Sequence, residues 1–244
     1  MESTELLFIQ NVSNVYINSS LFAGKLLTGK LLASKLGLFG KREIKKVLNN
    51  VNLKIKTGEI FGLTGKSGCG KTTLAKCILG LINYEGEIFL NGQKQKKITH
   101  KIQMIFQEPG ISLNPCKKIG WLMEEPLVIH KIGTKRERVQ KTDEMLLRVG
   151  LDPSYKTRRV HEVSGGQKQR VCIGRALMLE PRLLIADEAI SSLDVSTGAQ
   201  ILNLFRELHD NHALDILFIS HNRNAVEYLC DRIAVMHDGR INER

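Results

Sequence analysis

The stretch Gly65-Lys66-Ser67-Gly68-Cys69-Gly70-Lys71-Thr72 decides the fold of this 244-residue chain. It matches the phosphate-loop pattern G-x-x-x-x-G-K-[ST] at every fixed position. Its three glycines let the backbone curl, so that N–H groups converge on a polyphosphate at the N-terminus of a helix. Lys71 is suited to bridge the β- and γ-phosphates, and the Thr72 hydroxyl is suited to hold Mg²⁺. The stretch therefore predicts a nucleotide site.

The segments on either side of this phosphate loop fit the same prediction. Residues 59–64, Glu-Ile-Phe-Gly-Leu-Thr, predict a strand that enters the loop, and residues 72–81 predict a helix that leaves it. A glycine-rich turn without this chemistry would not need a lysine and a threonine at its end.

A second group of motifs lies later in the chain. Ser164-Gly165-Gly166-Gln167 precedes a helical stretch, and residues 182–188 form an apolar strand that ends in Asp187 and Glu188. Two carboxylates at the end of a buried strand are typical of a Mg²⁺ ligand and a catalytic base. Ser191-Ser192-Leu193-Asp194 follows, and a further apolar strand over 216–220 leads to His221.

Together and in this order, these motifs resemble those of the ATP-binding cassette (ABC) ATPases, over nearly the whole chain. Phe106-Gln107-Glu108-Pro109 and Ser112-Leu113-Asn114-Pro115 resemble a segment of the peptide and nickel uptake subfamily. Asp194-Val195-Ser196 suits the same branch. The sequence departs from the family pattern at two places: Val163 replaces a commoner Leu or Phe, which is a conservative apolar change, and Ala189-Ile190 replaces the usual Pro-Thr. Neither removes a catalytic group, although loss of the proline would loosen the loop after Glu188.

The resemblance implies a role for each motif residue. Asp187 would hold Mg²⁺ through water, Glu188 would polarise the attacking water, and His221 would contact the γ-phosphate. Gln107 would touch the metal and the water and sense a membrane subunit. Residues 164–166, here called the lid, would close over ATP bound to the opposite subunit, and Asp194 would pack across that seam. The implied catalytic residues are Glu188, His221 and Gln107, and the implied metal ligands are Thr72, Gln107 and Asp187. The implied ATP-binding residues are Tyr16, Gly65, Lys66, Ser67, Gly68, Cys69, Gly70, Lys71, Thr72, Thr73, Ser164, Gly165, Gly166, Gln167 and Asp194.

Composition and patterning predict one α/β unit. With 42% apolar residues the chain can bury a large core, and alternating strands and helices favour a mostly parallel sheet. The resemblance implies a P-loop NTPase core over about 1–110 and 164–244, with an antiparallel β region. It also implies a helical subdomain inserted over about 111–163, where the sequence has helical spacing, and a basic insertion over 20–45.

The formal net charge of +11 is concentrated in two segments. Residues 21–50 hold seven basic residues against Glu43, and residues 94–101 add four lysines. A solvated basic face, attraction to an anionic membrane surface and nucleic-acid binding all fit such a charge, but few aromatic residues are present to stack bases. For residues 20–40, an extended excursion between strands and an amphipathic membrane-surface element both stay open.

The expected function is that of an ATP-hydrolysing subunit of a multi-subunit importer of peptides, nickel or metal chelates. The implied partners are a second ATPase subunit, two membrane-spanning permease subunits and, indirectly, an extracellular binding protein, with no nucleic acid. No apolar run approaches the roughly 20 residues that span a bilayer, so we expect a peripheral protein at the cytoplasmic face of the membrane. The alternatives are an exporter ATPase and a soluble cassette ATPase acting on DNA or ribosomes. The latter usually carry a coiled-coil insertion, zinc-binding cysteines or tandem cassettes, and this sequence shows none.

Overall fold

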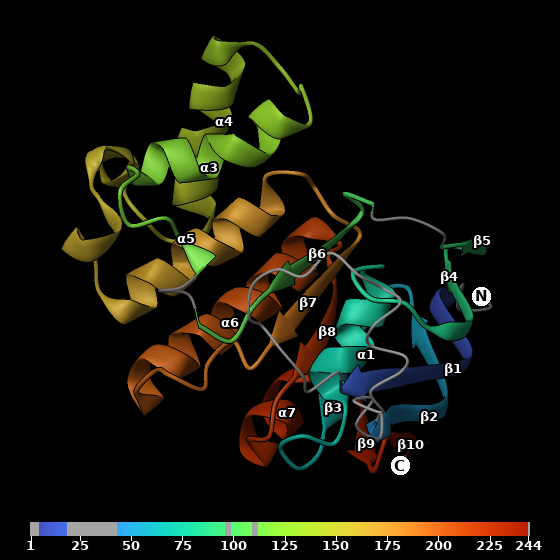
Figure 1. The fold of residues 1–244 in the computed structure, drawn as a ribbon. Coiled ribbons are helices and arrows are strands. Elements are labelled where there is room, and N and C mark those ends of the chain that lie inside the picture. Colours follow the sequence, from blue (N-terminus) through green and yellow to red (C-terminus); the bar gives the residue numbers. More distant parts are fainter. Residues whose placement is uncertain (1–4, 19–42, 96–98, 109–111, 244) are drawn as a thin grey trace, which may run out of the picture.

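The centre of the fold is a six-stranded sheet built from apolar strands. The computed structural model describes residues 5–18, 43–95, 99–108 and 112–243. The sheet has the order β10-β9-β3-β8-β7-β6, and all neighbours are parallel except β9 and β10 (Figure 1). Every residue of β7 and β8 is buried, as a strand covered on both faces requires. The strands are β3 (Ile60–Thr64), β6 (Ile102–Ile105), β7 (Leu183–Asp187), β8 (Asp215–Ile219), β9 (Arg232–His237) and β10 (Arg240–Glu243).

The parallel register places three motif segments at one edge of this sheet. Leu63 of β3 and Asp187 of β7 both pair with Ile219 of β8. The phosphate loop after β3, the carboxylates at the end of β7 and His221 beyond β8 therefore meet at the carboxyl ends of the strands, where open α/β sheets bind ligands.

A second sheet is antiparallel and has the order β2-β1-β4-β5. It consists of β1 (Glu5–Asn18), β2 (Glu43–Lys56), β4 (Glu85–Leu90) and β5 (Gln93–Lys94). Its apolar face, α1 (Lys71–Ile78) and one face of the six-stranded sheet share a continuous core. The predicted helix over 72–81 begins one residue earlier and ends at Ile78, because Gly80 adopts a left-handed conformation (φ 73°).

Three helices cover the opposite face of the six-stranded sheet (Figure 1). They are α5 (Gly165–Leu177), α6 (Val195–His212) and α7 (Arg223–Leu229). The mostly parallel sheet with an added antiparallel region confirms the predicted α/β fold class.

A helical region follows β6 and projects beyond the sheets, at the top of Figure 1. It contains α3 (Ile119–Ile129), α4 (Lys135–Arg148) and the short 3₁₀ helices η1 (Pro153–Thr157) and η2 (Val160–Glu162). The absence of a side chain at Gly174 lets α3 and α4 pack closely on α5: an added Cβ there would lie 2.8 Å from Met123 of α3 and 3.4 Å from Met145 of α4. The subdomain boundaries near residues 111 and 163 stay a prediction.

The sequence also leads us to expect no membrane-spanning segment and a basic insertion over residues 20–45. Among the residues that the structure describes, no helix is both long and apolar enough to cross a membrane. Most of the basic insertion predicted over 20–45 lies outside the described residues.

Candidate nucleotide site

The phosphate loop connects β3 to α1 through three glycines in conformations that side chains disfavour. Gly65, Gly68 and Gly70 have φ angles of 153°, 77° and 115°. A Cβ on Gly65 would lie 2.3 Å from the Met236 carbonyl oxygen, so glycine is required there for space as well as for backbone freedom. Gly70 caps α1, and the loop therefore ends at a helix N-terminus, where N–H groups attract anions.

An open cavity of about 370 Å³ lies above this loop. Predicted residues from four separate segments line it, so the fold brings the phosphate loop together with Gln107, Glu188 and His221. Val47 of β2 also lines the cavity, although it belongs to none of the sequence motifs. Its lining residues are Val47, Ser67, Gly68, Gly70, Lys71, Thr72, Thr73, Gln107, Glu188 and His221.

Lys71 is the buried cation of the site. Its Nζ donates to the carbonyl oxygens of Gly65 over 2.8 Å and Lys66 over 3.1 Å. A buried ammonium needs such acceptors, because burial penalises an unpaired charge. Cys69, a residue of the loop, is buried, and its Sγ lies 4.0 Å from the same ammonium.

Thr72 and Asp187 form a polar pair that fits a divalent cation. The Thr72 hydroxyl donates to Oδ2 of Asp187 over 2.7 Å. Asp187 is only 3% exposed, and burial raises the pKa of its carboxyl above the ordinary value. Its other oxygen, Oδ1, has no hydrogen-bond partner among the described residues. A buried oxygen without a partner, next to a hydroxyl, matches the oxygen ligands that Mg²⁺ prefers. Gln107 lines the same cavity and is exposed.

Glu188 and His221 are in direct contact. Nδ1 of His221 donates to Oε2 of Glu188 over 2.8 Å, and the backbone N–H of His221 donates to Oε1 over 3.2 Å. Glu188 has a left-handed backbone (φ 53°), which is uncommon for a residue other than glycine and is typical of functional sites. Its backbone N–H donates to the Ile219 carbonyl over 2.9 Å, and this bond holds the conformation.

The loop after Glu188 is tied back to that residue. The backbone N–H and hydroxyl of Ser191 donate to the Glu188 carbonyl over 3.1 and 2.9 Å. Ala189 and Ile190, which replace the family's usual Pro-Thr, are buried. The two hydrogen bonds and the two buried side chains restrain the loop that loss of the proline was expected to loosen.

The lid begins α5. Ser164 forms a capping box: its hydroxyl accepts from the Gln167 N–H over 3.3 Å, and its own N–H donates to Oε1 of Gln167 over 2.9 Å. Gly166 packs against Thr197 so closely that an added Cβ would lie 2.3 Å from the Thr197 methyl. Asp194 caps α6 by accepting from the Thr197 N–H and hydroxyl, and these hydrogen bonds lower the pKa of its carboxyl.

The lid and the phosphate loop do not meet within one chain. None of Ser164, Gly165, Gly166, Gln167 and Asp194 lines the cavity above the phosphate loop. Tyr16 lies in β1 opposite Lys45, and its side chain falls outside the described residues, so its predicted adenine contact stays a prediction.

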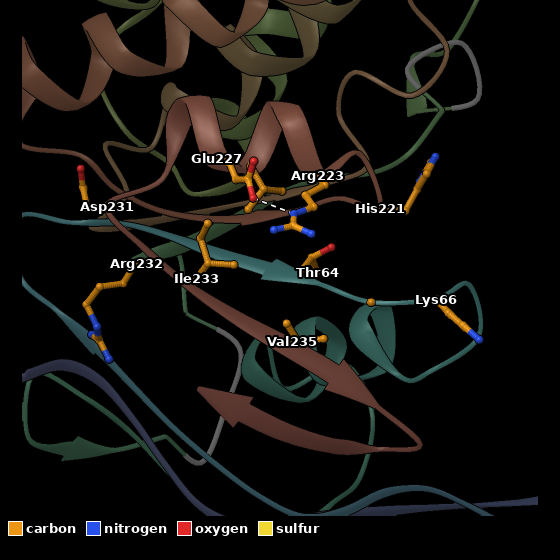
Figure 2. Close-up of a pocket in the computed structure, with 11 residues that line it drawn as sticks. Thr64, Lys66, His221, Arg223, Glu227, Asp231, Arg232, Ile233 and Val235 are labelled. Atoms are coloured by element: carbon orange, nitrogen blue, oxygen red, sulfur yellow. Dashed lines mark hydrogen bonds and ion pairs between the residues drawn. The ribbon is translucent and has the colours of Figure 1, made fainter. Parts of the chain in front are cut away.

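A second cavity, of about 910 Å³, adjoins the site (Figure 2). It lies between α7 and strands β3 and β9, and apolar side chains such as Val226, Ile233 and Val235 line it. At one end Gly65, Lys66 and His221 also contribute, so His221 lines both cavities. Most of the phosphate loop faces the smaller cavity, which therefore suits a polyphosphate better despite its smaller volume.

The sequence matches a family model at residues 48–191, and that model describes the ABC transporter. The chain belongs to the ABC transporter family. The identification made from the motifs, that of an ATP-binding cassette ATPase, is confirmed.

Among curated relatives, the oligopeptide transport ATP-binding protein AppF of Bacillus subtilis is 42% identical over 226 residues, which are 88% of this chain and 68% of AppF. The dipeptide transport ATP-binding protein DppF of Haemophilus influenzae is 42% identical over 219 residues, which are 86% of this chain and 67% of DppF. This ABC-family chain thus spans about two thirds of the length of these relatives.

Solved structures support the fold. A dimeric post-hydrolysis state of the ATP-binding cassette MJ0796 bound to ADP and Pi has a TM-score of 0.77, with 28% identity, 97% of this chain covered and 98% of that chain. The structure of cbiO1 from Clostridium perfringens has a TM-score of 0.79 at 23% identity, covers 98% of this chain and 87% of that chain, and shows the fold alone.

Proposed function

We propose that this chain is the ATP-hydrolysing subunit of a multi-subunit importer and that the cargo is a peptide. The observation that carries the proposal is the cavity in which Lys71, Thr72, Glu188 and His221 converge, with the buried Asp187 hydrogen-bonded to Thr72. The names of the relatives, which are oligopeptide and dipeptide transport ATP-binding proteins, favour a peptide over nickel or a metal chelate.

The phosphate loop binds the triphosphate of ATP in this proposal. Backbone N–H groups from Gly65 to Thr73 and the N-terminus of α1 face the anion. Lys71 then exchanges its carbonyl acceptors for phosphate oxygens. Little covalent help from the protein is needed, because phosphoryl transfer depends mainly on positioning and on neutralising charge.

Thr72, Asp187 and Gln107 are the proposed Mg²⁺ residues. The partnerless Oδ1 of Asp187 and its Thr72 contact support the first two. When bound, Mg²⁺ neutralises charge on the β- and γ-phosphate oxygens. Glu188 is the proposed base that orients the attacking water. His221 fixes both oxygens of its carboxylate and contacts the γ-phosphate.

Catalysis is proposed to need two ATPase subunits, identical or different. Each nucleotide then lies between the phosphate loop of one subunit and the lid of the other, so hydrolysis loosens the pair. The separation of these two elements within one chain supports this arrangement. The dimeric structures of MJ0796, a 28% identical cassette, support it as well.

A groove between β6, α3 and α5 is the proposed dock for a short helix of a membrane-spanning permease subunit. Its cavity measures about 350 Å³, and its apolar lining includes Phe106 and Ile129, which are 43% and 67% exposed. Gln107 follows Phe106 directly and lines the nucleotide cavity, so one short segment touches both places. Two permeases and an extracellular binding protein would complete the importer. Docking on the permeases would place this chain at the cytoplasmic face of the membrane as a peripheral subunit.

Purification of the complex tests this proposal. Membrane subunits should copurify, and ATPase activity in proteoliposomes should rise when the binding protein carries a peptide. Ribosomes or DNA in place of membrane subunits would support the soluble alternative. If membrane proteins copurify but no loaded binding protein changes the ATPase activity, the result would support an exporter.

A further inference from the structure

The side chain of Gln167 makes two contacts that together fix its orientation. Its Oε1 accepts the N–H of Ser164 over 2.9 Å, and its Nε2 donates to the hydroxyl of Tyr155 over 2.9 Å. The backbone N–H of Ser164 can only donate, so the amide oxygen must face it and the amide nitrogen must face Tyr155. The Tyr155 hydroxyl thus adds a contact to the Gln167 side chain of the capping box that starts α5.

Tyr155 is itself held firmly in η1. Its ring packs against the hydrophobic core that the helical region shares with one face of the six-stranded sheet, and the Arg158 guanidinium lies 3.9 Å from the ring centroid. The neighbouring Lys156 donates to both carboxylate oxygens of Asp143 over 2.7 and 2.8 Å, and this bidentate ion pair fixes η1 on α4.

The helix α3 packs on the other side of η1. A Cβ on Gly120 would lie 3.0 Å from the Cβ of Lys156, and the Ile119 N–H donates to the Arg158 carbonyl over 2.9 Å. The 3₁₀ helix η1 therefore contacts the lid through Tyr155 and contacts α3, whose far end lines the proposed docking groove, through Lys156 and Arg158.

We propose that Tyr155 is a positioning residue for the lid. Its hydroxyl orients Gln167, and through Gln167 it holds Ser164, Gly165 and Gly166 as they must lie to close over the nucleotide of the opposite subunit. This inference rests on the proposed function, because the lid acts on a nucleotide only in a pair of subunits. No sequence motif marks Tyr155.

Tyr155→Phe is the sharpest test, because it removes the hydroxyl and keeps the ring that packs against the core and Arg158. Loss of one neutral hydrogen bond should lower ATP turnover by the assembled complex about three- to ten-fold. The affinity of the full chain for ATP in its own phosphate loop should stay within about two-fold, because no residue of η1 lines that cavity. Tyr228→Phe is the matched control: Tyr228 lies on α7, and its hydroxyl donates to Asn203 of α6 over 2.7 Å rather than to a lid residue.

A double-mutant cycle separates positioning from general stability. In a Gln167→Ala background, Tyr155→Phe should cause no further loss of turnover, because the hydroxyl then has no amide to orient. Turnover equal to that of Tyr228→Phe would overturn the inference, and so would an equal loss in both backgrounds.

The same experiment distinguishes this inference from the proposed function. A wild-type complex without ATPase activity would refute the proposed function, and the inference with it. A wild-type complex that is active, together with a Tyr155→Phe complex of unchanged turnover, would overturn only the inference.

Discussion

His221 holds both carboxylate oxygens of Glu188, one through its ring nitrogen at 2.8 Å and one through its backbone N–H at 3.2 Å. The two residues follow neighbouring strands, β7 and β8, so the parallel register sets their distance. The carboxylate that would orient water is therefore fixed before a substrate binds, which reduces the reorganisation needed during reaction.

His221→Ala should slow hydrolysis while leaving ATP bound. The substitution removes the ring contact but keeps the backbone donor, so Glu188 loses one of its two anchors. A hydrogen bond to a charged group contributes about 1.5–3 kcal/mol, which corresponds to a roughly 10- to 100-fold slower turnover. Phosphate release by the complex and nucleotide binding by the full chain measure the two effects. His212→Ala, at an exposed position of α6, is the control; equal rates for both variants would argue against the role of His221.

Asp187→Asn should change the dependence on Mg²⁺. It keeps the side-chain size and the contact with Thr72 but removes the charge that a divalent cation needs. The Mg²⁺ concentration for half-maximal activity should rise more than about ten-fold, as expected when a charged ligand is lost. A Mg²⁺ titration of ATPase activity measures this, with the exposed Asp210→Asn as control. An unchanged Mg²⁺ requirement would show that Asp187 does not act on the metal.

Gly166→Ala should destabilise the start of α5. The added methyl would lie 2.3 Å from Cγ2 of Thr197, and overpacking of this kind costs about 1–3 kcal/mol. Thr197→Ser removes that methyl and keeps the hydroxyl that donates to Asp194, so the double variant should recover most of the lost stability. Chemical unfolding of the three variants measures the change in free energy. A Gly166→Ala protein as stable as wild type would contradict the packing described here.

Thiol labelling should be fast at one of the five cysteines, Cys116, and slow at a second, Cys69. Burial raises the pKa of Cys77, Cys172 and Cys230 to about 12, so these thiols stay protonated and unreactive near pH 8. Cys116 is exposed and should react with a maleimide without loss of activity. In a Cys116→Ser background, slower labelling of Cys69 should abolish ATP binding, and Mg-ATP should prevent it. Peptide mapping identifies the modified residue; inactivation through Cys77 or Cys172 would contradict this assignment.

Local sequence was enough to predict the elements of the site but not the contacts between them. The phosphate loop, the strand ending in Asp187 and the helix after Ser164 each follow from a short pattern, and the structure contains all three. The contact between Glu188 and His221 depends on the register of β7 and β8. The close approach of Thr197 to Gly166 depends on how α5 packs on α6. Tyr155 and Val47 reach the lid and the cavity only through tertiary packing, so no pattern around them reveals their places.

Replacement of Glu188 by Gln tests the central claim most directly. Glutamine keeps an oxygen that can accept from His221 but lacks the charge that orients and activates water. We predict that phosphate release by the full complex falls at least about 100-fold, within the range for loss of a general base. ATP should still bind, and gel filtration with Mg-ATP should show an ATP-bound pair of subunits, whereas Lys71→Ala should form none. Hydrolysis by Glu188→Gln within a few-fold of the wild-type rate would show that Glu188 is not the base and would contradict the mechanism.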